Sequence, residues 1–171
     1  MDFAAIFHAI QMSGWATELR ESALAYPIVM SMHLTAIALF GGLILLTNLR
    51  LLGVLLRDVP VVNVVGGLRP WKRLGFVVMV TCGLLLAGSK AEQYYPNPYF
   101  QVKMLLLASV GVHALVFRKS VYGRTEPSAG NARLAACISL VLWLGILSMG
   151  RWIAYYEGDR NQPARIAEAA R

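Results

Sequence analysis

Residues 22–49 have the sequence SALAYPIVMSMHLTAIALFGGLILLTNL, which contains no Asp, Glu, Lys or Arg. A helix needs about 20 consecutive apolar residues to cross the hydrocarbon core of a bilayer, so this stretch predicts a membrane-spanning helix. Three later runs, 74–89, 104–117 and 134–150, also lack these residues but are shorter. Each reaches spanning length when it is extended through the basic residue at its end, because long basic side chains can reach back to the headgroups.

The composition of the whole chain agrees with this pattern. Its 171 residues are 57% hydrophobic and 15% charged, whereas soluble domains are about 45–50% apolar and about 25% charged. We therefore predict an all-α bundle of four transmembrane helices, spanning roughly 24–46, 73–93, 99–118 and 133–155. This single domain fills residues 1–158, and residues 159–171 form a polar C-terminal tail.

Two further segments have recognisable patterns. Segment 3–15 is too short to span a membrane, but it carries apolar residues at helical spacing, namely Phe3, Ile6, Phe7 and Ile10. Such a segment predicts a short interfacial helix on the outer surface, before the first span. Residues 57–70 contain two prolines and a Gly–Gly pair, so we expect them to form the loop between the first two spans.

The net charge of +7 follows the predicted topology and does not indicate nucleic-acid binding. If the N-terminus lies outside, the two cytoplasmic loops hold nine basic residues: Arg50, Arg57, Arg69, Lys72, Arg73, Arg118, Lys119, Arg124 and Arg133. Only Asp58 and Glu126 oppose them there. Because cytoplasmic loops are enriched in Lys and Arg, this distribution places both termini outside, in the periplasm of a bacterium.

His33 is the first candidate functional residue, because it lies inside the longest apolar run. Ionisable side chains at membrane depth are costly and usually mark a site or a pathway. Neutral imidazole binds iron, and haem b sites in membrane bundles use histidines that project inward from the helices. His33 is therefore a candidate metal ligand, to haem b. The alternative is a histidine that hydrogen-bonds a neighbouring helix.

His113 and His8 are candidates for a second axial ligand of the same haem. His113 lies on the third predicted span, about 9 Å deeper than His33 when each is counted from the outer boundary of its own span. A polar contact between helices is therefore the alternative for His113. His8 lies on the interfacial segment, which could fold over the outer mouth of the bundle; otherwise His8 is simply solvated.

Lys103 and Arg151 lie near the outer ends of the third and fourth spans, and Lys90 is nearby. They could form a basic collar just outside His33, which would hold haem propionates, a quinone headgroup or an anionic lipid. The alternative is that these side chains only reach toward the headgroups. Arg151 stands between Gly150 and Trp152, so backbone can approach closely there and an indole can stack.

The sequence also leaves room for a protein without a cofactor. Ser31, Thr35, Ala38 and Gly42 form a ladder of small residues along the first span. Such ladders let another helix approach closely, as in an accessory subunit of a larger membrane complex or in a homo-oligomer. No nucleophile–base pair and no carboxylate in mid-membrane is apparent, so neither an enzyme nor a proton-coupled transporter is favoured.

Several motifs resemble those of a bacterial family of four-helix inner-membrane proteins defined by a domain of unknown function. They are RES…YPI…H at 20–33, LRLLG at 49–53, RPWKRLGF at 69–76, NPYFQVKMLLL at 97–107 and WLG…GRWIAYY at 143–156. The resemblance covers about residues 15–156 and implies a fold and a location but no activity. The family histidine falls on His33 and its GRW on Gly150, Arg151 and Trp152. A looser similarity, in architecture, is to cytochrome b-type and copper-resistance four-helix membrane proteins.

We thus expect an integral inner-membrane protein that binds haem b near the periplasmic leaflet and transfers electrons. His33 would be an axial ligand, and Lys103 and Arg151 would hold the propionates. The alternatives are a cofactor-free accessory subunit and a quinone-binding or lipid-binding protein that uses the same basic collar.

Overall fold

The computed structural model describes the backbone of residues 3–169 and the side chains of residues 3–156. Every regular element in this part is helical. In chain order they are α1 (Phe3–Gln11), α2 (Gly14–Glu21), α3 (Ala25–Leu51), α4 (Val61–Ser89), α5 (Ala91–Tyr94), α6 (Pro98–Phe117), the π-helical segment η1 (Arg118–Tyr122) and α7 (Ala129–Ala169).

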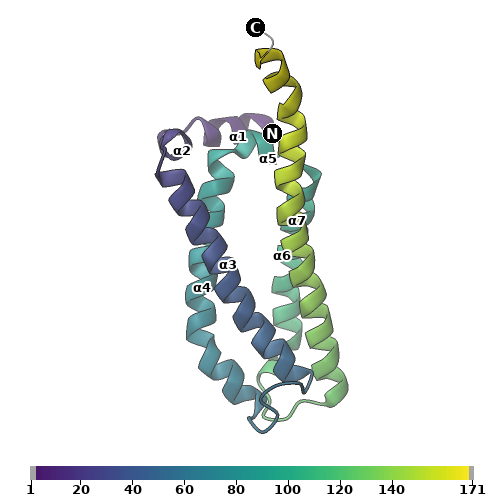
Figure 1. The fold of residues 1–171 in the computed structure, drawn as a ribbon. Coiled ribbons are helices and arrows are strands. Elements are labelled where there is room, and N and C mark those ends of the chain that lie inside the picture. Colours follow the sequence, from purple (N-terminus) through teal and green to yellow (C-terminus); the bar gives the residue numbers. More distant parts are fainter. Residues whose placement is uncertain (1–2, 170–171) are drawn as a thin grey trace.

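Four segments are long and apolar enough to cross a membrane: Ala25–Leu51, Val61–Ser89, Pro98–Tyr122 and Ala129–Tyr156. They run up and down in a bundle, with α1, α2 and α5 at one end and the α3–α4 and η1–α7 loops at the other (Figure 1). We call these the α1 end and the loop end. The predicted all-α fold with four transmembrane helices and a short N-terminal helix is confirmed.

The helices pack as two close pairs. α3 packs along α4, α6 packs along α7, and α3 also contacts α7, whereas the side between α4 and α6 is much less closely packed. At the loop end a buried apolar cluster joins all four: it contains Leu51, Val61, Val121, Ala132, Ala135 and Ala136. The bundle is therefore closed on three sides and loose on the fourth.

Helix α4 begins earlier than the sequence indicates. The loop predicted at 57–70 is wrong beyond Pro60, because α4 starts at Val61 and continues through Pro70. Val61 and Val64 are buried, and Val61 belongs to the loop-end cluster. Burial of these valines outweighs the helix-breaking tendency of the glycines and the proline, because tertiary packing commonly overrides intrinsic helix propensity.

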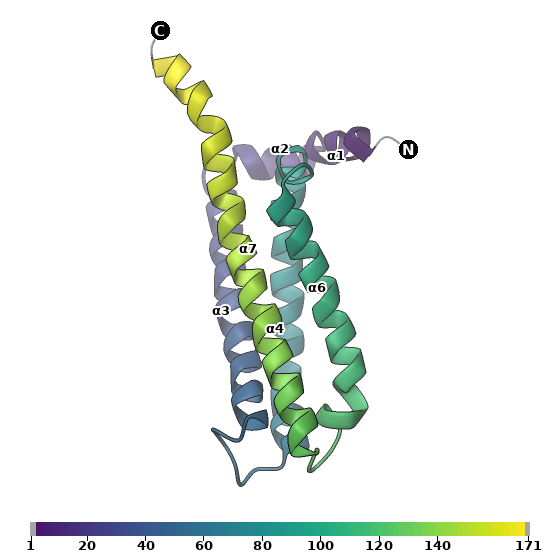
Figure 2. The ribbon, with the colours of Figure 1, turned by 90° about the vertical axis from the view of Figure 1, so that its right-hand side faces the viewer.

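The α1 end is covered by short helices. The segment predicted as one interfacial helix over 3–15 forms α1 and the beginning of α2, which lie across the end of the bundle (Figures 1 and 2). α1 contacts α5 and α4, and α2 contacts α4 and α3. At the other terminus, α7 continues to Ala169 through the predicted polar tail, of which residues 170–171 lie outside the described part.

Candidate functional site

His33 lies on the face of α3 that packs against α4. Its Nδ1 atom is 2.9 Å from the backbone oxygen of Met79, and its side chain is half-buried. Gly83, one turn further along α4, makes room for the ring: a Cβ atom at that position would lie 3.0 Å from Cε1 of His33. The imidazole is thus held between two backbone segments of α4.

This hydrogen bond determines which ring nitrogen is available to a ligand. A carbonyl oxygen can only accept, so Nδ1 must carry the proton and donate it to Met79. In the neutral ring Nε2 then has a free lone pair, and no described group hydrogen-bonds to it. Metal-binding histidines commonly donate one ring N–H to a backbone carbonyl in this way, which orients the other nitrogen.

Lys103, on α6, is the predicted site residue whose charge acts on His33. Its ammonium is close enough for its charge to act on the imidazole. A Cβ atom at Gly150 of α7 would lie 3.7 Å from Nζ, so the amine lies over a small residue there. Within the described side chains Lys103 has no acidic partner. A half-buried ammonium without a counter-ion is costly inside a membrane and would attract an anionic group.

The other basic residues of the predicted collar point elsewhere. Arg151 is exposed, and its guanidinium lies over the ring of Tyr155, 4.7 Å from the ring centre. Lys90 lies over the ring of Tyr26, 5.2 Å from its centre. The structure thus brings Lys103 together with His33, and places Arg151 on the outer surface of α7.

His113 contacts a different pair of helices. Its Nε2 atom is 3.0 Å from the backbone oxygen of Ala135 on α7, and the residue is 8% exposed. Its ring packs 4.9 Å from that of Phe117. Ala135 lies six residues, about 9 Å, from the loop-end start of α7. Met79, the partner of His33, lies eighteen residues, about 27 Å, from the loop-end start of α4. The two histidines are therefore at different depths.

His8 fastens α1 to α5. Its Nδ1 atom pairs with Glu92 of α5, whose second carboxylate oxygen accepts a 2.9 Å hydrogen bond from Gln11. The amide oxygen of Gln11 accepts in return from the backbone N–H of Glu92, also at 2.9 Å. Phe7 stacks on Tyr95, with the ring centres 4.6 Å apart. This ion pair engages His8 at the outer surface.

Toward the loop end, polar side chains make hydrogen bonds between helices that the sequence does not predict. Asn48 is 1% exposed and donates from Nδ2 to Ser139 Oγ of α7, at 3.0 Å. Lys72 of α4 donates to the hydroxyl of buried Thr47. These contacts join α3 to α7 and to α4. No motif marks them, because each partner is far away in the sequence.

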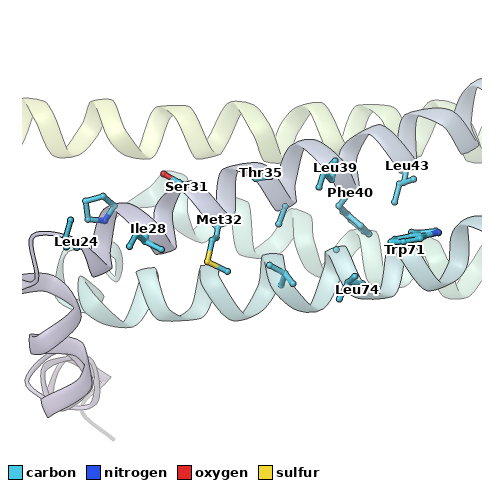
Figure 3. A pocket seen from close by; sticks show the side chains of 14 residues that line it. Leu24, Ile28, Ser31, Met32, Thr35, Leu39, Phe40, Leu43, Trp71 and Leu74 are labelled. Atoms are coloured by element: carbon cyan, nitrogen blue, oxygen red, sulfur yellow. The ribbon is translucent and has the colours of Figure 1, made fainter.

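One cavity, of about 840 Å³, is an apolar groove along α3 and α4 (Figure 3). None of the five predicted site residues lines it, but Ser31 and Thr35 of the small-residue ladder do. Several of its walls are well exposed, among them Leu39 and Trp71. A second cavity, of about 550 Å³, lies at the α1 end between α1, α2, α4, α5 and α6.

The side chains that could act as metal ligands limit which metal or cofactor the protein can hold. No three His, Cys, Asp or Glu side chains gather in the described part of the chain. Cys82 and Cys137 are both free thiols. A metal ion held by protein ligands alone needs several such groups. A haem iron needs only one or two axial ligands, because the porphyrin supplies the other four.

Comparisons with known proteins give a family but no activity. Neither the curated proteins nor the solved structures contain a match to this chain. The model of a family of unknown function, DUF6644, matches residues 22–156, which include all four spans and both His33 and Lys103. Because this match covers most of the 171 residues, the chain belongs to the family of unknown function DUF6644.

Proposed function

We propose that this membrane protein binds one haem b beside His33 and serves in electron transfer. The observation that carries the proposal is the hydrogen bond from His33 Nδ1 to the oxygen of Met79, which leaves Nε2 with a free lone pair. Lys103 adds an unpaired positive charge next to it. A ligand that carries both a metal ion and a carboxylate would suit this pair: the metal would bind Nε2 of His33, and the carboxylate would pair with the ammonium of Lys103.

The residues of the chain have separate roles in this proposal. His33 would ligate the iron, Met79 would orient the imidazole, and Lys103 would hold a propionate. Gly83 and Gly150 have no side chains, which lets the His33 ring and the Lys103 amine lie close to the backbones of α4 and α7. When bound, haem supplies one-electron redox chemistry, and the protein tunes it through the ligand and the nearby charge.

In this proposal His33 is the single iron ligand that the described helices supply. His113 bonds to Ala135 at another depth, and His8 pairs with Glu92 on the surface. Both remain candidates only if the helices rearrange when haem binds. We further propose that the α1 end faces the periplasm, because nine basic residues lie in the loops of the loop end or in the parts of the helices toward that end. His33 would then lie on the periplasmic side of a bacterial inner membrane.

The test is a reduced-minus-oxidised absorption spectrum of the detergent-purified full chain, expressed with ample haem supply. We expect a b-type band in the natural protein that His33→Ala abolishes. His113→Ala is the matched control, because it removes an equally apolar-embedded imidazole that bonds to a backbone carbonyl. This variant should retain the band.

Two results would contradict the proposal. A flat spectrum from folded natural protein would exclude bound haem. A band that survives His33→Ala but disappears in His113→Ala would move the site to the contact between α6 and α7. In either case His33 would be a packing residue that ties α3 to α4.

A second candidate function is that of an accessory subunit without a cofactor. The groove of about 840 Å³ favours it, because Ser31 and Thr35 lie in its floor and no described element covers it. A transmembrane helix of a partner would fit such a surface. Mild detergent extraction followed by size-exclusion chromatography tests this candidate. A larger assembly that Thr35→Trp dissociates would support it, and a monomer with a haem band would reject it.

A further inference from the structure

The second cavity, at the α1 end, is enclosed by parts of the chain that have no role in the proposed haem site. Its floor and one wall are residues of α4, and Phe100 of α6 forms part of the opposite side. Phe7 and Ile10 of α1 and Trp15 of α2 form its roof. Its volume of about 550 Å³ lies within the range of small-molecule sites, about 300–1,000 Å³.

Aromatic side chains dominate the walls of this cavity. Phe7, Trp15, Tyr94 and Phe100 all line it. The rings of Tyr94 and Phe100 stack on each other in parallel, 5.3 Å apart with 11° between their planes. Thr81 adds a hydroxyl to the lining. An aromatic lining favours a planar ring, which gains from ring–ring contact beyond the burial of its area.

The roof is held in place from outside the cavity. Glu92 of α5 pairs with His8 and exchanges two hydrogen bonds with Gln11, which closes α1 over the site. Arg20 of α2 donates to the backbone oxygen of Ser89 at 3.1 Å. The indole of Trp15 packs so closely on α4 that a Cβ atom at Gly88 would lie 2.3 Å from it.

The open side of the cavity indicates where its ligand comes from. α4 and α6 make few direct contacts with each other, and both line the cavity. Leu84, between them and the bilayer, is 67% exposed. A ligand would therefore enter sideways from the membrane, and any hydrocarbon tail could remain among the lipid chains.

From these observations we infer that the cavity binds a lipid-soluble molecule with a planar ring head and a hydrocarbon tail, that is, a membrane quinone. The ring would pack among Trp15 and the stacked pair of Tyr94 and Phe100, and the tail would leave between α4 and α6. This inference does not depend on haem binding, because neither His33 nor Lys103 lines the cavity.

Trp15 provides a reporter for the test. The full chain carrying W71F, W143F and W152F retains Trp15 as its one tryptophan and is reconstituted in phosphatidylcholine vesicles. Decylubiquinone is then titrated into the membrane. We expect saturable quenching of the Trp15 emission. A second protein that retains only Trp152, which is 51% exposed at the same end of the bundle, should show quenching that rises linearly with the quinone content of the membrane.

A cavity-filling substitution distinguishes binding from partitioning. Ala87→Phe places a ring into the cavity and should abolish the saturable component. Ala108→Phe, on an exposed face of α6, lines neither cavity and should leave it unchanged. Ala87→Leu fills less space, so it should weaken the component without removing it. Linear quenching of Trp15, or quenching that Ala87→Phe does not change, would overturn the inference.

A measurement on the protein with all four tryptophans covers the case in which the single-tryptophan chains unfold. A ligand that binds the folded state raises the melting temperature. We expect decylubiquinone to raise it in the natural chain and in Ala108→Phe, but not in Ala87→Phe. Decanol, which has the tail without the ring, should give no comparable rise. An equal rise with decanol would overturn the assignment of a ring site and indicate a pocket for lipid chains.

Discussion

Lys103 and Arg151 show that the environment of a basic side chain determines whether it can take part in a site. Both are basic residues near the α1 ends of their membrane spans, and their positions in the sequence allow the same two alternatives. In the structure the Lys103 ammonium lies inside, within reach of His33 and without an acidic partner in the described part. Arg151 lies outside on the ring of Tyr155. Sequence spacing could not separate the two, because it does not show which face of each helix meets the bundle.

This difference predicts opposite effects of one substitution on stability and on ligand binding. Lys103→Met removes an uncompensated, half-buried charge but keeps most of the volume. We expect the haem-free protein to gain about 1–3 kcal/mol of unfolding free energy. The same variant should retain less haem, because a propionate loses its partner. Thermal unfolding and the haem-to-protein ratio check the two effects. Arg151→Met should change neither, and a destabilised Lys103→Met would contradict the view that the charge is unpaired.

At the scale of elements, the contact between α3 and α7 depends on one glycine of an adjacent pair. A Cβ atom at Gly41 would lie 2.8 Å from the indole of Trp143, whereas Gly42 has nothing within 4 Å. The Trp143 ring also meets Phe40 edge-on, with the ring centres 5.6 Å apart. The two helices thus approach through a flat aromatic ring laid against bare backbone.

The pair Gly41 and Gly42 therefore predicts two different outcomes for the same chemical change. Gly41→Ala should cost about 1–3 kcal/mol, because the methyl group overlaps a well-packed ring. Gly42→Ala should be neutral or gain up to about 1 kcal/mol from helix propensity. Unfolding of both variants in the same detergent is the measurement. Equal stabilities would show that Trp143 moves aside freely.

Elements were predicted best where burial in lipid alone determines them. The apolar runs indicate four spans without any knowledge of packing partners. The first twelve residues of α4 were not predicted to be helical, because Gly66, Gly67 and Pro70 are typical of a loop. In the structure the burial of Val61 and Val64 stabilises the helix there. A hydrogen bond from His33 to a neighbouring helix was the alternative to a metal ligand, and the structure shows such a bond. Its acceptor, the oxygen of Met79, could not be predicted, since it is a backbone atom 46 residues away and any residue type provides one.

At the scale of the whole molecule, α1 is a cap whose ion pair and hydrogen bonds to α5 lie at the surface. α1 meets α5 through Glu92, His8 and Gln11, and none of its residues is buried. Exposed ion pairs contribute only about 0–1 kcal/mol. The cap should therefore open without unfolding of the four long helices.

Removal of the carboxylate tests this independence. Glu92→Ala should increase hydrogen exchange in α1 several-fold, because small local openings are governed by the few contacts that hold the segment. The melting temperature of the bundle should hardly change. Glu18→Ala, an exposed carboxylate on α2, is the control and should leave exchange in α1 unaltered. Unchanged exchange in Glu92→Ala would mean that apolar contacts such as the Phe7–Tyr95 stack hold the cap.

The uneven packing of the bundle has a mechanical consequence. The α3–α4 and α6–α7 pairs meet along α3 and α7, and the α4–α6 side has few contacts to break. The contact between α3 and α7 can therefore act as a hinge between the two helix pairs. We expect a rotation that moves α4 and α6 apart to be the easiest deformation of the bundle, because it breaks the fewest packing contacts. The lateral pressure of the surrounding lipid would act on that angle first, so membrane thickness and composition become variables that set the shape of this protein.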